Sequence, residues 1–330
     1  MFITIKNKFK TEVTLSTFGA SIYDIKTLDK NNVLSSITLE PKNEEDFKYS
    51  TSYFGKTIGR TGGRIKDSKF ILNNQEYVIE SNDPNGLHGG NKGFSYQEFD
   101  VQQDEDNVSF NVKFHYFSPS LEMGYPGDLS LDVTYRLYKD ENKLEINYLA
   151  NSTKDTLCNL SNHTYFNLNV NSKNNILDHY LYINSSKMLD IVNAVPTNII
   201  NTPLIYSFKN KHKIKDYLFD ESIICNTRGY DNPYIFDNNN DDKIILEDEL
   251  SGRRLIINTS YPSVVIYTCN YIEDFIMNNN RKEEQFDAVA IECMFIPNSI
   301  NNPKINIKKD ILKKNQQYNE TITYNFDVIK

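Results

Sequence analysis

Apolar and polar residues alternate along much of this chain, and the alternation constrains its fold more than any other feature. The segment from 108 to 116, VSFNVKFHY, carries an apolar side chain at every second position, and residues 129–137 repeat the pattern. A period of two is typical of a β-strand with one buried face. No helical period is sustained; residues 214–219 are compatible with one short turn of helix.

Short polar turns separate several of these segments. They lie at 140–142, between apolar runs at 129–137 and 144–148; at 73–74, between runs at 70–72 and 77–79; and near 251–252, between runs at 244–246 and 255–257. Strands joined by such short turns pair as antiparallel hairpins. Strand-like runs continue to Tyr324 without a linker or a repeat of fixed period. We therefore predict an all-β protein, a large antiparallel β-sandwich, with residues 1–330 forming one domain.

Composition excludes several classes of function. The net charge is −8, and the 36 basic residues are scattered among 44 acidic ones, so we expect no nucleic-acid partner. No segment approaches the ~20 consecutive apolar residues needed to span a bilayer, and the N-terminal residues lack the apolar core of a secretory signal. We expect a soluble, cytoplasmic protein that does not bind membranes. The four cysteines are far apart and form no CxxC pair, which favours free thiols.

Two of the five histidines lie in unusual surroundings. His88 is flanked by glycines in NGLHGG, where the backbone can approach a ligand closely. His163 lies in LSNHTYFNL, a strand-like segment interrupted by polar side chains. A hydrogen-bonded structural role is the alternative for both, and it is the interpretation we adopt for His115, His179 and His212.

Glu292 is the single carboxylate in the apolar run AVAIECMFIP. Burial of a carboxylate is costly and raises its pKa toward the range of a general base. The alternative is a structural carboxylate paired with an arginine, such as Arg60 or Arg64 of the segment GRTGGRI. That glycine-rich segment lacks the spacing of a phosphate-binding loop.

Six segments together carry a resemblance to a known family. In chain order they are GRTGGRI, LHGG, SNHTYFNL, GYDNPY, YPSVVIYTCNY and IECMFIPNSIN. In order and spacing the chain resembles the galactose mutarotases, the aldose 1-epimerase family, over nearly its whole length. The resemblance implies a galactose mutarotase-like supersandwich with an open cleft for a monosaccharide. It also implies interconversion of the α and β anomers of free aldohexoses such as galactose or glucose.

The same resemblance implies roles for five residues. Glu292 corresponds to the general base that removes the proton from O1, and His163 to the general acid that protonates the ring oxygen. His88 corresponds to a histidine that hydrogen-bonds near the ring oxygen, and Arg60 and Asp231 to residues that grip ring hydroxyls. This chemistry requires no cofactor and no metal, so a monosaccharide is the expected partner; both a monomer and a homodimer remain open.

Some positions depart from the family pattern. Gly63 replaces an asparagine, Met294 a glutamine, Asn298 an aspartate and Asn198 a glycine. These changes affect the expected grip on substrate and leave the acid and base unchanged. Aromatic support for a sugar would come from residues in or near the matching segments, with core packing the expected role of Phe166: Tyr125, Tyr165, Phe166 and Tyr267.

Three other functions are compatible with parts of this pattern. The first is a sugar-binding module without turnover. The second is a hexose-6-phosphate 1-epimerase, in which several cations would converge on a phosphate: Arg60, Arg64, Arg253 and Arg254. The third is a metal enzyme with His88, His163 and Glu292 as ligands, although close ligand spacing such as HxH is absent.

Overall fold

Strands dominate the computed structural model, which describes residues 1–81, 83–170, 174–237, 242–305, 307 and 310–329. The largest sheet has nine strands, and every neighbouring pair in it is antiparallel. In spatial order its strands are β10 (Asp100–Glu105), β11 (Ser109–Ser118), β12 (Leu129–Tyr138), β13 (Lys143–Ser152), β27 (Gln317–Val328), β23 (Arg253–Thr259), β22 (Ile244–Asp248), β17 (Tyr180–Ile183) and β20 (His212–Lys213).

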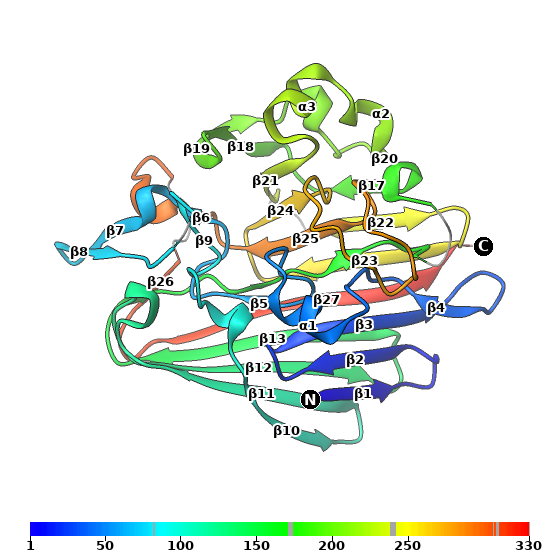
Figure 1. The fold of residues 1–330 in the computed structure, drawn as a ribbon, viewed down its shortest axis with the longest axis horizontal. Helices are drawn as coiled ribbons and strands as arrows, with labels where there is room; N and C mark the ends of the chain where they lie inside the picture. Colours follow the sequence, from blue (N-terminus) through cyan, green and yellow to red (C-terminus); the bar gives the residue numbers. More distant parts are fainter. Residues whose placement is uncertain (82, 171–173, 238–241, 306, 308–309, 330) are drawn as a thin grey trace.

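Two further antiparallel sheets complete the main architecture (Figure 1). The six-stranded sheet runs β16 (Tyr165–Phe166), β25 (Val289–Met294), β24 (Ser263–Tyr267), β21 (Asp231–Ile235), β18 (Lys187–Val192) and β19 (Val195–Asn201). The four-stranded sheet runs β1 (Phe2–Lys6), β2 (Glu12–Ser16), β3 (Ser21–Leu28) and β4 (Leu34–Ser36). The prediction of an all-β, antiparallel fold is confirmed.

Short strand pairs and helices connect these sheets. The pairs are β5 (Thr57–Ile58) with β15 (Ser161–Asn162), β6 (Arg64–Ile65) with β9 (Gly86–Leu87), β7 (Lys69–Leu72) with β8 (Gln75–Val78), and β14 (Thr156–Leu157) with β26 (Ile311–Leu312). The three predicted hairpins are present as β7–β8, β12–β13 and β22–β23. Helix α2 (Lys215–Leu218) is the expected helical turn, whereas α1 (Glu44–Tyr49) and α3 (Glu221–Thr227) were not predicted. Both unpredicted helices are short and begin after an Asn43 or Asp220 N-cap.

The main core lies between the two larger sheets. Alternate residues of β12, from Leu129 to Leu137, are fully buried in one cluster with Val289, Ile291 and Cys293 of β25. Because side chains alternate along a strand, the remaining residues of β25 face away from this core. Ala290 accordingly belongs to a separate cluster, and Glu292 shares its face. The hydrophobic pattern of β25 thus directs one carboxylate out of the sandwich.

No helix among the described residues combines the length and the apolar character that crossing a lipid bilayer demands.

Lys56, just before β5, is buried, and no carboxylate in the described ranges forms an ion pair with it. Its ammonium group donates to the carbonyl of Lys48 at 2.8 Å, at the end of α1. The same group lies 5.5, 5.6 and 4.9 Å from the ring centroids of Phe18, Phe47 and Tyr96. Burial lowers the pKa of Lys56 from 10.5 to about 7. Cation–π contacts and one carbonyl therefore replace only part of the hydration that this ammonium loses.

We predict that Lys56→Met stabilises the fold, and more at low pH than at high pH. The unfolded chain binds more protons at this position between the folded pKa of about 7 and the unfolded pKa of 10.5, so wild-type stability is lost as pH falls through that range. The advantage of the variant should therefore shrink by about 2–3 kcal/mol between pH 6.5 and 9. Urea unfolding of both proteins at the two pH values measures this difference; an equal difference at both would contradict the prediction.

Candidate active site

One face of the six-stranded sheet presents two carboxylates close together. Glu292 of β25 pairs with Val265 of β24, and Asp231 of β21 pairs with Tyr267 of β24. Directly opposed residues share a face, and Val265 and Tyr267 are two residues apart on one strand. Glu292 and Asp231 therefore project on the same side, diagonally across β24.

His163 reaches Glu292 from the segment before β16. Tyr165 of β16 pairs with Ala290 of β25, and alternation places His163 on the same side as Tyr165. The distance from His163 Nε2 to Glu292 Oε1 is 3.3 Å, and both side chains are almost fully buried. The main chain of His163 is held on both sides, because its N–H donates to the Lys56 carbonyl and its carbonyl accepts from Gly55 N–H, each at 2.9 Å. The acid and base assigned by resemblance thus lie in contact.

His88 approaches from the glycine-rich loop after β9. Its Nδ1 accepts a hydrogen bond from the backbone N–H of Gly63 at 3.1 Å, so in the neutral ring the proton is on Nε2. Its ring lies 5.3 Å from that of His163. At the following residue, Gly89, a Cβ would lie 1.7 Å from the carbonyl oxygen of Gly59. The glycine therefore permits the close approach of two loops that places His88 here.

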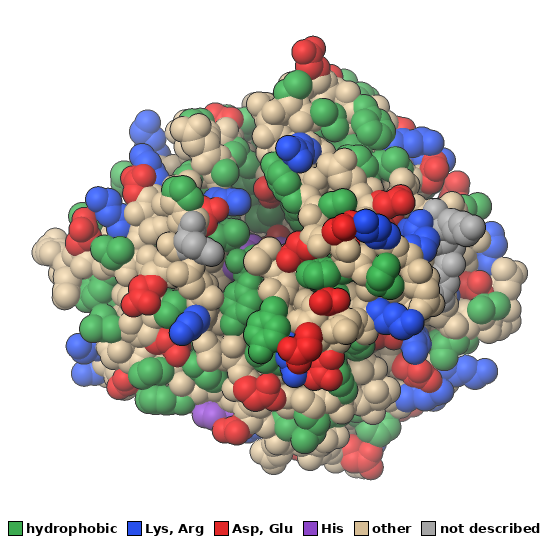
Figure 2. Space-filling model, viewed as in Figure 1, with side chains coloured by type: hydrophobic (Ala, Val, Ile, Leu, Met, Phe, Trp, Pro, Cys, Tyr) green, Lys and Arg blue, Asp and Glu red, His purple; other side chains and the backbone are tan. Residues whose placement is uncertain are grey.

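A cleft of about 520 Å³ opens over these groups. Figure 2 shows it as a hollow with histidine surface visible inside. Its inner lining includes His88, Asp231 and Glu292, with His163 packed beside them. Its outer lining combines apolar and polar side chains, among them Met188, Asp190, Ile191, Ile200, Tyr206, Asn226 and Tyr271.

Arg60 does not reach this cleft, which corrects the expectation that it contacts substrate. The side chain is buried, and its guanidinium donates to Ser118 and to the carbonyls of Pro126 and Gly127 at 2.7–3.1 Å. These acceptors belong to the loops at the ends of β11 and β12, so Arg60 has a structural role. Arg64 lines the cleft instead, 3.9 Å from Asp83 and on the strand paired with Leu87, next to His88.

Burial governs the electrostatics of the cleft. It raises the pKa of Glu292 well above 4.5; the charge of Asp231 adds to the rise and that of Arg64 opposes it. Burial also raises the pKa of Asp231, and Arg64 again opposes the rise. For the two histidines burial acts in the other direction: it lowers the pKa of His163 to about 3 and that of His88 well below 6.5. Burial thus favours the uncharged forms of His163 and Glu292.

The other histidines have the structural roles expected of them. His115 lies against Asp132 at 2.7 Å on the largest sheet, His179 accepts from the Leu168 N–H at 3.0 Å, and His212 contacts the Ser207 carbonyl at 2.9 Å.

The suggested aromatic platforms do not line the cleft. Tyr125 and Phe166 belong to hydrophobic clusters, the latter as expected. Tyr165 is buried behind His163, with ring centroids 5.1 Å apart, and Tyr267 packs against Tyr165. The aromatic residues in the cleft lining are Tyr206 and Tyr271.

Three of the family departures have structural consequences. Gly63 has a φ of 71°, and a Cβ there would lie 2.6 Å from Pro297. Pro297 therefore fills the space that a side chain at position 63 would need. Met294 is fully buried, and its sulfur lies 3.8 Å from the same Cβ position, an ordinary van der Waals distance. Asn298 accepts from the Lys66 N–H at 3.1 Å and so ties the segment after β25 to the one after β6.

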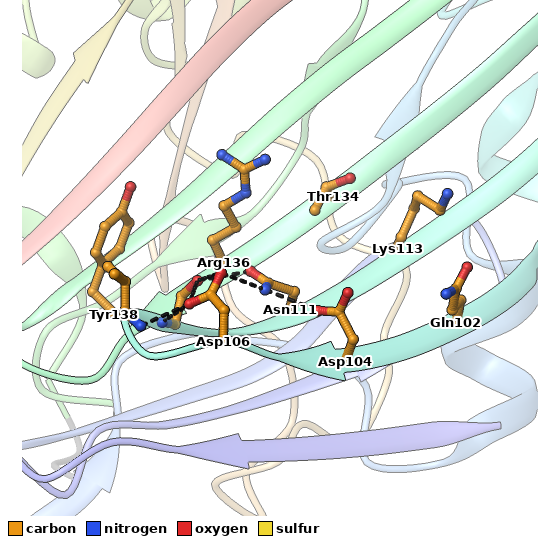
Figure 3. Close-up of a pocket in the computed structure, with 10 residues that line it drawn as sticks. Gln102, Asp104, Asp106, Asn111, Lys113, Thr134, Arg136 and Tyr138 are labelled. Carbon is orange, nitrogen blue, oxygen red and sulfur yellow. Dashed lines mark hydrogen bonds between the residues drawn. The ribbon is translucent and has the colours of Figure 1, made fainter.

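A second hollow, of about 510 Å³, lies on strands β10–β12 of the largest sheet (Figure 3). Its polar groups satisfy one another: Asn111 donates to Asp104 at 2.9 Å, and Asp106 accepts from the N–H groups of Val108 and Ser109 at 2.7 Å. Arg136 pairs with Glu145 at 3.2 Å. This hollow has no buried acid–base pair among its lining residues, so we assign the chemistry to the cleft at Glu292.

A metal site is conceivable where three possible ligand atoms lie within 4.8 Å of one another, on His88, His163 and Glu292. A neutral histidine that binds metal through Nε2 carries its proton on Nδ1. The Gly63 N–H points at Nδ1 of His88, which places the proton on Nε2 and makes that atom a hydrogen-bond donor. The trio therefore fits proton transfer better than metal ligation.

Comparison with known proteins identifies the family. The family model described as aldose 1-epimerase matches residues 1–325. The chain belongs to the aldose 1-epimerase family. A galactose mutarotase from Mus musculus is 29% identical, with 96% of this chain and 91% of that protein covered. A maltose epimerase from Levilactobacillus brevis is 26% identical, with 98% and 93% covered.

The fold of this aldose 1-epimerase family member agrees with that of a solved relative. The crystal structure of an aldose epimerase homologue from C. elegans matches with a TM-score of 0.91 at 27% identity, covering 100% of this chain and 99% of the other. The predicted galactose mutarotase-like sandwich is confirmed. Of the five site residues predicted from the sequence, four lie at the cleft: His88, His163, Asp231 and Glu292. Arg60 does not, and Arg64 lies there instead. Both arginines lie in one segment, and only the pairing of β6 with β9 distinguishes them.

Proposed function

We propose that this protein interconverts the α and β anomers of free aldohexoses, with Glu292 as general base and His163 as general acid. The observation that carries the proposal is the 3.3 Å contact between His163 Nε2 and Glu292 Oε1 beside the cleft. The hydroxyl O1 and the ring oxygen O5 are both bonded to C1, so a base and an acid acting on them must lie close together. The 3.3 Å separation of Nε2 and Oε1 supports the proposal, because two groups this close can each hydrogen-bond one of two oxygen atoms on the same carbon.

Ring opening then needs two proton movements. Glu292 takes the proton of O1, the C1–O5 bond breaks, and His163 gives its proton to O5. Rotation about C1–C2 presents the other aldehyde face, and the two groups run in reverse to close the ring as the other anomer. Each positioned acid or base contributes about 10²–10⁴-fold.

The number of protons on the Glu292–His163 pair does not change, because Glu292 takes one proton as His163 gives one. Ring opening starts with the charge on Glu292 and the proton on His163, while ring closure starts with both groups neutral. Burial favours the neutral pair, and Arg64 opposes this by lowering the pKa of Glu292. Hydrogen bonds from sugar hydroxyls to the carboxylate would support the charged pair further.

Polarimetry tests this proposal. Freshly dissolved α-D-galactose and α-D-glucose are followed in metal-free buffer with and without the protein. A faster approach to the same equilibrium rotation is the expected result. A folded protein that accelerates neither sugar contradicts it; sugar binding by calorimetry in that case would favour the non-catalytic binding module.

Arg64 is proposed to grip ring hydroxyls, together with Asp231 and His88. Loss of a hydrogen bond to a charged group costs about 1.5–3 kcal/mol, so Arg64→Met should raise KM about 10- to 100-fold with a smaller change in kcat. Arg60→Met is the matched control. Because Arg60 donates to buried carbonyls, it should lower the melting temperature, while the KM of the folded fraction stays near the wild-type value. An unchanged KM in Arg64→Met would contradict the assignment.

The charge distribution gives little support to a phosphorylated hexose as substrate. Of the four arginines considered, Arg64 alone belongs to the cleft lining. Arg253 donates to the carbonyls of Leu168 and Thr27, and Arg254 pairs with Glu247. A phosphate dianion would instead meet Asp190, Asp231 and Glu292 in the lining.

A reducing disaccharide is the second candidate substrate. The cleft volume of about 520 Å³ lies in the range of about 300–1,000 Å³ that holds drug-sized ligands, which exceeds the needs of one sugar ring. The related Levilactobacillus brevis protein is named a maltose epimerase. Adding maltose to the polarimetric series distinguishes the candidates, because a kcat/KM for maltose above that for galactose and glucose would favour the disaccharide.

A further inference from the structure

Tyr53 occupies a position that neither the acid–base assignment nor the cleft lining explains. Its ring centroid lies 4.7 Å from that of His88, in an edge-on arrangement, and 5.8 Å from that of His163. The two histidine rings are 5.3 Å apart. The three rings therefore form a compact triangle, with the tyrosine against both histidines.

No other residue in the described part of the chain hydrogen-bonds the His163 imidazole from behind. Its Nδ1 is buried and meets no partner on another residue, its one backbone hydrogen bond being with its own main chain, in contrast to Nδ1 of His88, which accepts from Gly63. The orientation of the His163 ring about its Cβ–Cγ bond therefore depends on packing. The rings that pack against it are Tyr53, His88 and Tyr165.

The loop that carries Tyr53 is itself held firmly. The carboxylate of Glu273 accepts from the Ser50 hydroxyl at 2.6 Å and from the Ser52 N–H at 2.8 Å. The Tyr53 carbonyl accepts from the Lys56 N–H at 3.0 Å. Tyr53 has a φ of 58°, a left-handed conformation that costs energy for a residue with a side chain and persists where the surroundings enforce it.

The geometry points to Tyr53 as a positioning residue that holds the His163 and His88 rings in the orientation required for proton transfer. The inference rests on the proposed epimerase activity. Tyr53 acts through the histidines and needs no contact with the sugar. Its ring carries the effect, so a residue that keeps the ring preserves the function. Its hydroxyl is hydrogen-bonded to that of Tyr96, which in turn donates to the Ser50 carbonyl at 3.2 Å.

Kinetics of Tyr53→Leu and Tyr53→Phe test the inference. A misplacement of about 1 Å at a reacting group costs about 10²-fold, so Tyr53→Leu should lower kcat about 10- to 100-fold with little change in KM. Tyr53→Phe should retain near wild-type kcat. Tyr23→Leu is the matched control, because Tyr23 is a half-buried tyrosine that packs edge-on against Phe47, 5.0 Å away, and contacts neither histidine; its kcat should remain unchanged.

Two results would overturn the inference: wild-type kcat in folded Tyr53→Leu, or an equal loss in Tyr53→Phe and Tyr53→Leu, which would assign the effect to the hydroxyl. If Tyr53→Leu does not fold, Glu273→Gln loosens the loop while leaving the ring in place, and it should lower kcat in the same direction, with KM unchanged; no loss of kcat would then count against the inference. An inactive wild-type protein would instead refute the proposed function, so the two failures are distinguishable.

Discussion

Glu292→Gln is expected to lower kcat by about 10²–10⁴-fold, the contribution of a positioned general base, while the fold is retained. Glutamine has the size and shape of glutamate, so the packing against Val265 and the main-chain pairing of β25 persist. The amide cannot accept the O1 proton. Turnover is therefore lost at the proton-transfer step, and substrate binding through Arg64 and Asp231 remains.

The stability of this variant provides its internal check. Burial raises the pKa of Glu292, and its Oε2 has no hydrogen-bond partner among the described residues, so a neutral amide removes the cost of either protonating or burying that carboxylate. We expect an unchanged or higher melting temperature. Glu247→Gln is the control, because Glu247 is a buried carboxylate on β22 that pairs with Arg254 at 2.6 Å, far from the cleft; it should lower stability and leave kcat unchanged. More than a tenth of wild-type kcat in folded Glu292→Gln would refute the base assignment.

His163→Asn should cost nearly as much, about 10²–10³-fold in kcat. Asparagine is shorter than histidine, so its amide does not reach the position of Nε2, and it cannot transfer a proton to O5. His88→Asn is the informative comparison. His88 is a neutral donor in our scheme and transfers no proton, so its loss of kcat should be smaller. Steady-state polarimetry of both variants measures the order; a larger loss in His88→Asn would exchange the roles of the two histidines.

The protonation state of His163 can be measured independently of turnover. Burial lowers its pKa to about 3, so nitrogen NMR of the imidazole should show a neutral ring in the free protein between pH 5 and 8. A ring that titrates near its ordinary pKa of 6.5 would show that burial does not hold His163 neutral, because the imidazole would then carry a second proton below that pH before substrate binds.

The sequence alone determined the class of fold, and through the family resemblance it named candidate residues for the site. Alternation of apolar residues along 129–137 and 144–148 reports which side chains face the core, and the short turn between them leaves antiparallel pairing as the only close arrangement. The position of Glu292 followed from the same rule, because a carboxylate within an apolar strand must face something other than that core. Such patterns are local, so they can be interpreted without the tertiary structure.

Only the tertiary structure decided which arginine faces the cleft and how the acid–base pair is supported. Arg60 and Arg64 are four residues apart in one segment, and no local pattern distinguishes a guanidinium that binds the loop carbonyls of Pro126 and Gly127 from one that lines a cleft. Tyr53 carries no motif at all. Its role depends on ring contacts with residues 35 and 110 positions away, and contacts of that range are set by how sheets and loops pack, which a local sequence pattern does not encode.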